Sequence, residues 1–265
     1  MTPRRGMFEF FRPRQYKVKL FKYIDFKNKY WDQPLRENSL FFSSINEVRG
    51  VNDQDEFNHK WDFPSYFFRN KGHFLSESYD RLFSNSRVLC LSKNLDRTCW
   101  ETFCKTGEGI CYEFIYDESK KAKDITCGQI VYDNKKILNV PEYVLGRINN
   151  FELRDLLTQE RVFSKPELAK MIYWLNNSKQ FEEIFTTHIF QELALKKLDS
   201  FIFEGEFRFI HIVNSIGPVN PKSKFNNFKL SFETLGLELS HLYTSEIKKV
   251  EAIGRNGLKI DKIPF

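Results

Sequence analysis

The sequence predicts an α+β fold, on three observations about where its apolar residues fall. Several short segments before residue 133 show the apolar pattern of strands, the region 142–198 repeats its apolar residues at helical spacing, and strand patterning then returns. A chain of 265 residues is long enough for one domain of this kind. We therefore expect a basic arm at 1–15 and a single domain at 16–265, with a helical subdomain inserted at 142–198.

The strands are expected in chain order, each on its own pattern. In YKVKLFKYIDF (16–26), apolar and aromatic residues alternate in part with basic ones, which indicates the first strand. A short helix or turn around Pro34 should follow, and the segment containing Trp100 and Phe103 should be helical. The remaining strands are expected at 40–44, 86–92, 109–116, 125–132, 201–213 and 246–254.

The inserted region carries a start signal for one of its helices. Ser164-Lys-Pro-Glu167 fits a capping box with proline in the first turn. Leu168, Met171, Ile172 and Leu175 then recur at the spacing of one helical face. A helix should therefore begin at this point.

Composition excludes several classes of protein. No stretch approaches the ~20 continuous apolar residues of a membrane helix, and the N-terminus lacks the apolar segment of a secretion signal. We expect a cytoplasmic protein with no membrane partner. The five cysteines are odd in number and none are spaced as Cys-x-x-Cys, so free buried thiols are expected in place of disulfides or a metal site.

The positive charge is concentrated at the N-terminus. Residues 1–30 hold nine lysines and arginines against two acids, whereas the rest of the chain is nearly neutral. Such an arm, which also carries Phe8, Phe10 and Phe11, suits nucleic acid, an acidic partner or an anionic surface. The alternative is a solvated arm whose phenylalanines pack back on the domain.

The segment FIFEGEFRFI (201–210) carries the strongest candidate for a site. Strand alternation places Phe203, Gly205, Phe207 and Phe209 on one face and Glu204, Glu206 and Arg208 on the other. The apolar face is core. Three explanations remain open for the charged face: a solvated surface with ion pairs, a structural ion network, or a working site.

Several motifs, taken together and in order, resemble a widespread bacterial family that is filed as a domain of unknown function. They are Leu20-Phe-Lys-Tyr23, Phe42-Ser-Ser44, Asn52-Asp53 with Glu56, Cys90-Leu-Ser92, Trp100 with Phe103, Gly109 followed by Glu113-Phe114, and Glu204-Gly-Glu206-Phe-Arg208. The resemblance spans about residues 18 to 256. The chain departs from the family pattern at Gln54 in place of proline, Phe103 in place of tyrosine and Phe201 in place of tryptophan.

The order of these elements is also similar to that of ADP-ribosyltransferase-like enzymes, which are glycosyltransferases that use NAD. This resemblance implies a mixed or antiparallel sheet core with a helical insertion before the Glu-x-Glu strand. It also implies that Glu206 is catalytic, that Glu204 acts on the nucleophile, that NAD is the co-substrate and that no metal is needed. The resemblance does not identify the acceptor, for which protein, nucleic acid and water are the alternatives. A toxin or phage-defence role is common among such proteins. The implied NAD-binding residues are Lys22, Tyr23, Ser43, Asn52, Asp53, Ser92, Trp100, Phe103 and Arg208.

Two other classes of function compete with this interpretation. The first is a nucleic-acid-binding protein or metal-dependent nuclease that uses the basic N-terminus, with Mg²⁺ held by the carboxylates of Asp53, Glu56, Glu204 and Glu206. The second is a non-enzymatic interaction protein whose polar strand face is a docking surface. Arg208 beside the acidic pair argues against the metal. For Trp100 and Phe103 the alternative is simple core packing, and for Asn52 and Asp53 it is a turn.

Overall fold

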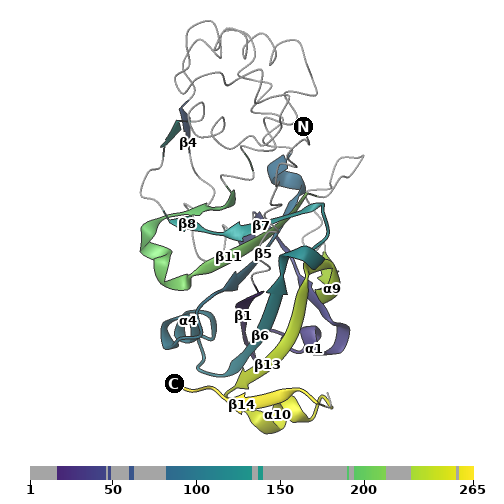
Figure 1. The fold of residues 1–265 in the computed structure, drawn as a ribbon. Coiled ribbons are helices and arrows are strands. Elements are labelled where there is room, and N and C mark those ends of the chain that lie inside the picture. Colours follow the sequence, from purple (N-terminus) through teal and green to yellow (C-terminus); the bar gives the residue numbers. More distant parts are fainter. Residues whose placement is uncertain are drawn as a thin grey trace, which may run out of the picture.

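A large, mostly antiparallel sheet forms the centre of the protein (Figure 1). The computed structural model describes residues 17–45, 47–48, 82–132, 190, 194–212, 228–254 and 257–265, together with the backbone of 60–62 and 137–139. Eight described strands make up this sheet, with seven in the order β14-β13-β6-β1-β5-β11-β7 and β3 paired to β5. Their bounds are β1 (Lys17–Asp25), β3 (Ser43–Ser44), β5 (Ser86–Ser92), β6 (Gly109–Asp117), β7 (Ile125–Gln129), β11 (Glu206–Ile212), β13 (Leu237–Thr244) and β14 (Lys259–Lys262).

The strand directions agree with the expected mixed or antiparallel sheet. Neighbouring strands run antiparallel, except that β14 lies parallel to β13 at one edge. Described pairs outside this sheet join β2 (Ser39–Phe41) to β12 (Lys229–Ser231), β8 (Val131–Tyr132) to β10 (Lys196–Lys197), and β4 (Lys60–Asp62) to β9 (Ile137–Asn139). With few and short helices in the described residues, the protein is a mixed α/β structure, as the sequence predicts at this level.

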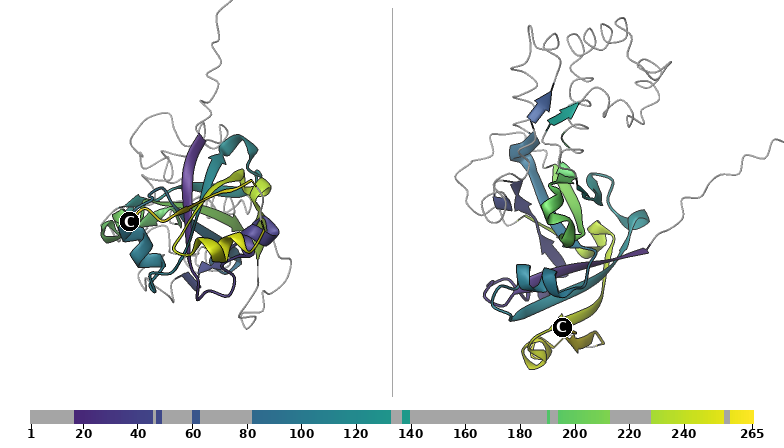
Figure 2. Two further views of the ribbon diagram at one scale, coloured as in Figure 1. Left: turned by 90° about the horizontal axis from the view of Figure 1, so that it is seen from below. Right: turned by 90° about the vertical axis from the view of Figure 1, so that its left-hand side faces the viewer.

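Short helices cover both faces of the sheet (Figure 2). On one face, α1 (Gln33–Glu37) and α9 (Phe232–Leu235) contribute to the largest apolar cluster, which includes Leu20, Phe114 and Phe209. On the other face, α4 (Arg97–Phe103) packs against β1 and β6 through a smaller cluster. The side chains of β1 alternate between these two clusters because successive residues of a strand point to opposite faces.

The strand boundaries near the candidate site differ from the prediction. Residues Asp199–Glu204 form the 3-10 helix η3, and β11 begins only at Glu206. Gly205 separates them with a φ of 50°, in the left-handed region that favours glycine, so the predicted strand cannot run continuously through 201–205. Glu204 and Glu206 therefore do not share one strand face.

The C-terminal part of the chain also departs from the prediction. The expected strand at 246–254 is instead the helix α10 (Ile247–Glu251), in which Val250 is buried while Lys248 and Glu251 are exposed. The closing strands are β13 and β14, which the local sequence pattern does not predict. The short 3-10 helix η2 (Glu118–Lys120) follows β6.

Two predicted segments lie largely outside the described residues. These are the basic arm at 1–15 and most of the helical region 142–198, including the capping box at 164–167. No helix in the part that the structure describes is both long enough and apolar enough to cross a membrane.

Candidate functional site

A pocket of about 300 Å³ opens where β1 and β5 diverge. Every residue of β1 pairs with β6, but only Phe21 pairs with β5, through Ser92. Beyond that pair β5 follows β11, so the two halves of the sheet separate and leave space between them. Seven of the predicted site residues line this space: Lys22, Tyr23, Ser43, Ser92, Phe103, Glu204 and Glu206.

A second pocket of about 370 Å³ adjoins the first. The two pockets share lining residues on β1, near β3 and on α4, so they form two lobes of one site with Lys22 in the common wall. Polar groups of Asp25, Asn28 and Gln33 and the ring of Tyr30 line the second lobe. The residues common to both lobes are Lys22, Tyr23, Phe41, Ser43, Glu47 and Phe103.

The acidic pair belongs to a buried chain of charges. Lys197 Nζ lies 2.7 Å from Glu204 Oε2 and 3.3 Å from Glu206 Oε2, so it bridges the two carboxylates. Arg208 donates to Glu206 Oε1 through Nε and Nη2, both at 2.7 Å, and its Nη1 donates to the Ala194 carbonyl. Glu206 is 3% exposed and Arg208 is fully buried, which excludes a solvated strand face.

The surrounding cations keep Glu206 ionised. Burial by itself raises the pKa of this carboxyl, but the charges of Arg208 and Lys197 outweigh burial and hold the pKa well below its usual range. A hydrogen bond from Cys90 acts in the same direction. Glu206 is thus a carboxylate at neutral pH, placed on the wall of the first lobe.

The turn that carries Glu204 is held by β5 and the residues that follow it. Ser92 Oγ donates to the Glu204 carbonyl at 2.6 Å, and Asn94 Nδ2 donates to the Phe203 carbonyl at 2.9 Å. The amide of Glu206 donates to the Tyr132 hydroxyl at 2.8 Å. These bonds fix both acidic residues against the first lobe although they come from different elements.

Lys22 differs from Lys197 in its surroundings. Its Nζ donates to the Cys90 carbonyl at 3.0 Å, and no carboxylate of the described residues forms an ion pair with it. The residue is half-buried in the wall of the pocket. Burial therefore lowers the pKa of Lys22, although nearby Glu206 and Cys90 oppose this effect.

The predicted aromatic residues separate into two groups. Phe103 lines both lobes and stacks on Tyr23, with ring centroids 6.0 Å apart, and the Tyr23 hydroxyl donates to the Asn94 carbonyl at 2.6 Å. Trp100 is not among the lining residues. It is buried behind the pocket, where it meets Tyr23 edge-on at 6.4 Å. Its position is that of a core residue which supports the pocket wall.

The other predicted residues fall outside the pocket or outside the described chain. Arg208 lies behind Glu206 and does not line either lobe. Asn52, Asp53 and Glu56 lie in a stretch that the structure does not describe.

The cysteines of the small cluster are thiols in the core. Burial raises the pKa of Cys99 and of Cys104 to about 12, and holds that of Cys111 well above its usual value. Within the described ranges, no group of three or more His, Cys, Asp or Glu side chains is arranged to hold a metal ion.

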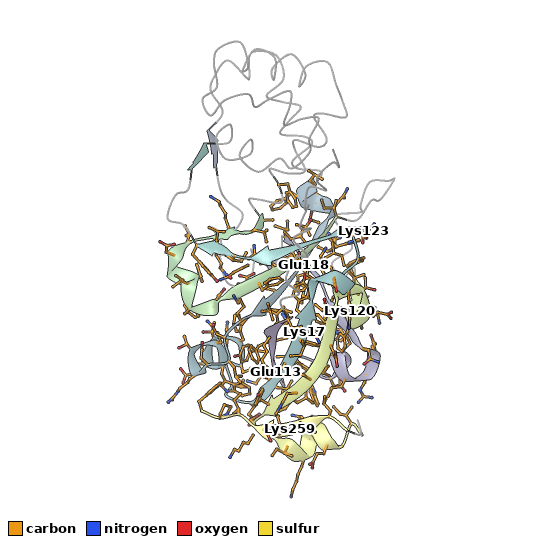
Figure 3. All side chains as sticks on the ribbon, viewed as in Figure 1. Lys17, Glu113, Glu118, Lys120, Lys123 and Lys259 are labelled. Carbon is orange, nitrogen blue, oxygen red and sulfur yellow. The ribbon has the colours of Figure 1, made fainter. Side chains whose placement is uncertain are left out.

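The sequence pattern misses two polar residues, Lys197 and Asn94, that the structure places at or beside the site. Lys197 and Asn94 give no signal, since each lies in an ordinary polar stretch and becomes important only through long-range pairing. Glu113, which Figure 3 labels, is a third buried carboxylate; it lies on β6 and lines neither lobe. Lys19, Ser240 and Tyr243 contact its oxygens at 3.1, 2.9 and 3.1 Å, so its contacts are those of a structural ion cluster.

Comparisons of the chain with family models, with curated proteins and with solved structures find no match.

Proposed function

We propose that the protein is an NAD-dependent ADP-ribosyltransferase or NAD glycohydrolase in which Glu206 stabilises the transition state. The observation that carries this proposal is a buried carboxylate, held ionised by Arg208 and Lys197, on the wall of a two-lobed pocket. The order of elements, which is similar to that of ADP-ribosyltransferase-like enzymes, supports the same reaction. A cytoplasmic toxin or phage-defence effector is the setting that this resemblance suggests.

The chemistry requires a negative charge beside the ribose. When the bond between nicotinamide and the ribose C1′ breaks, positive charge develops on the sugar as in glycoside hydrolysis. The Glu206 carboxylate would accept a hydrogen bond from the ribose 2′-hydroxyl, and this bond strengthens as the charge grows. Nicotinamide leaves as a neutral molecule, so no proton donor is needed for departure.

Glu204 would act on the incoming nucleophile. Its carboxylate lines the same lobe and shares Lys197 with Glu206, which fixes its position relative to the ribose. From there it would orient the acceptor or accept its proton. The acceptor itself, whether a protein side chain, a nucleobase or water, stays open.

The two lobes suit a ligand made of two ring systems joined by charged phosphates. Lys22 lies in the wall between the lobes, where its ammonium would meet the pyrophosphate. The stacked rings of Tyr23 and Phe103 would support the nicotinamide side, and Tyr30 the adenine side. Ser43 would hydrogen-bond a ribose, Ser92 would act by positioning Glu204, and Arg208 would act through Glu206.

The direct test is the release of nicotinamide from NAD by the purified full chain, with and without a divalent metal. Glu206→Gln keeps the shape but removes the charge, so turnover should fall by on the order of 10²–10⁴ with little change in NAD affinity. Glu204→Gln should impair transfer to an acceptor more than it impairs NAD hydrolysis. The matched control is Glu101→Gln, which changes an exposed carboxylate on α4.

Two results would contradict the proposal. One is that the wild-type protein neither binds nor cleaves NAD across a range of acceptors, and the other is that Glu206→Gln keeps full activity. Metal-dependent cleavage of nucleic acid in the same assay would favour the nuclease alternative.

A further inference from the structure

We propose that Lys22 is a nucleophilic amine that forms an imine with an aldehyde bound at the junction of the two lobes. The site is a modification and binding site for carbonyl compounds, distinct in chemistry from the role of an ammonium that contacts phosphate. Where the proposed function holds, the aldehyde is the open-chain reducing end of ADP-ribose, which NAD hydrolysis leaves in this pocket.

Lys22 is placed where the two lobes meet. It lies in the wall common to both lobes, so a ligand in either lobe lies against this residue. The hydrogen bond from Nζ to the Cys90 carbonyl holds the group in place at 3.0 Å. This bond uses an N–H of the amine and leaves the nitrogen lone pair of the neutral form free to attack.

The two lysines of the pocket differ in the partners of their side-chain nitrogens. Lys197 forms ion pairs with Glu204 and Glu206, which stabilise its ammonium form. Lys22 has no ion pair with a carboxylate of the described residues, and burial lowers its pKa. Lysines in such desolvated settings are the ones that act as nucleophiles, because more of the amine is neutral near pH 7.

The reaction needs no further reagent. The Lys22 nitrogen attacks the carbonyl carbon, the C–N bond forms, and the carbonyl oxygen is protonated to give a carbinolamine. Loss of the proton on nitrogen and of the hydroxyl as water then gives the imine. One amine proton is transferred to the carbonyl oxygen in the carbinolamine and the other leaves with the hydroxyl, so atoms and electrons balance with water as the sole by-product.

The test uses pyridoxal 5′-phosphate, an aldehyde, followed by borohydride, which reduces the imine to a stable secondary amine. Peptide mapping by mass spectrometry then gives the modified lysines of the intact chain. Modification of Lys22 should exceed that of Lys197 at least about tenfold, because the ion-paired lysine stays protonated. Lys22→Arg keeps the positive charge but cannot form an imine, so labelling at this site should disappear.

The dependence of the labelling rate on pH provides the second readout. The rate at Lys22 should rise with a midpoint below the ordinary lysine value. The labelling rates of exposed Lys17 and Lys259, measured in the same samples, provide the comparison. Labelling of Lys22 no faster than that of these exposed lysines would overturn the proposal.

A parallel reaction with ADP-ribose and cyanoborohydride separates this proposal from the proposed function. Adduct formation at Lys22 with both aldehydes supports the two together. If pyridoxal phosphate modifies Lys22 but NAD is not cleaved and no ADP-ribose adduct forms, the result supports a nucleophilic Lys22 and counts against the NAD reaction. Modification by neither aldehyde rejects the nucleophilic lysine, even if NAD is cleaved.

Discussion

Arg208 shows why a single residue at this site has to be judged by its contacts. As a residue on an open strand face, it would be a solvated cation of small energetic value. The structure instead buries it completely, with its donors directed to Glu206 and to the Ala194 carbonyl. A structural ion network and a working site are therefore compatible, since the network fixes the charge state of the carboxylate that lines the pocket.

Arg208→Met should destabilise the protein by about 3–5 kcal/mol, because it leaves Glu206 and a backbone carbonyl without their main donor. Urea unfolding of the variant and the wild type at pH 7 measures this difference in the free energy of unfolding. The control is Arg36→Met, which removes an arginine whose side chain is 64% exposed in its pair with Asp32 and should cost at most ~1 kcal/mol. A loss of similar size in both variants would mean that the buried pair contributes no more than a surface pair.

The depressed pKa of Glu206 predicts a specific pH dependence of stability. The pKa in the folded state lies below the usual value of 4.5, so the stabilisation is present above that value and is lost as the pH falls through the region below it. The free energy of unfolding should therefore decrease more steeply for the wild type than for Glu206→Gln between about pH 5 and pH 3. Equal slopes, measured by urea unfolding at each pH, would mean that Glu206 is not held ionised by its neighbours.

At the scale of elements, the sequence is informative where one local pattern decides the structure. Alternation or a continuous apolar run locates β1, β5, β6 and β7, and Pro34 marks the short helix α1. The same rule fails at 201–205, because a glycine with positive φ ends a 3-10 helix there, and at 246–254, where the spacing of Ile247 and Val250 fits a helix. β13 escapes prediction because a register shift between Leu239 and His241 interrupts its alternation.

The junction between η3 and β11 can be tested through Gly205. An added Cβ would lie 2.6 Å from the Asn94 side chain, which holds the Phe203 carbonyl, and the φ of 50° disfavours any other residue. Gly205→Ala should cost about 2–3 kcal/mol, from the left-handed backbone and the disturbed hydrogen bond. Gly107→Ala is the matched control, since its φ is also positive but its Cβ meets no atom, and it should cost about 1 kcal/mol. Equal losses in thermal or urea unfolding would show that Asn94 moves aside without cost.

At the scale of the whole molecule, the site exists only because distant segments pair. Lys22 and Cys90 are 68 positions apart, and Ser92 and Glu204 are 112 apart, yet each pair is joined by a hydrogen bond. Separate local motifs identify Glu204, Glu206, Lys22 and Tyr23 as candidate site residues, but they do not show that these residues lie together. The divergence of β1 from β5 brings them to one pocket, and that divergence depends on register, which no local pattern contains.

The basic arm provides a test of the nucleic-acid alternative on the whole chain. β1 begins at Lys17, which pairs with Asp117 at the end of β6, so deletion of residues 1–15 leaves every described strand pair intact. The melting temperature should stay nearly unchanged, whereas binding of the full chain to single-stranded nucleic acid should weaken on truncation if the arm neutralises phosphates. Because each neutralised phosphate releases counterions, truncation should also reduce the slope of log affinity against log salt concentration by about 0.7 for each phosphate that the arm neutralises.

NAD cleavage should be the same in both chains, since residues of the two described lobes begin at Phe21. A drop of several degrees in melting temperature would instead assign Phe8, Phe10 and Phe11 to the fold, and loss of NAD cleavage in a stable truncated chain would place the arm at the pocket.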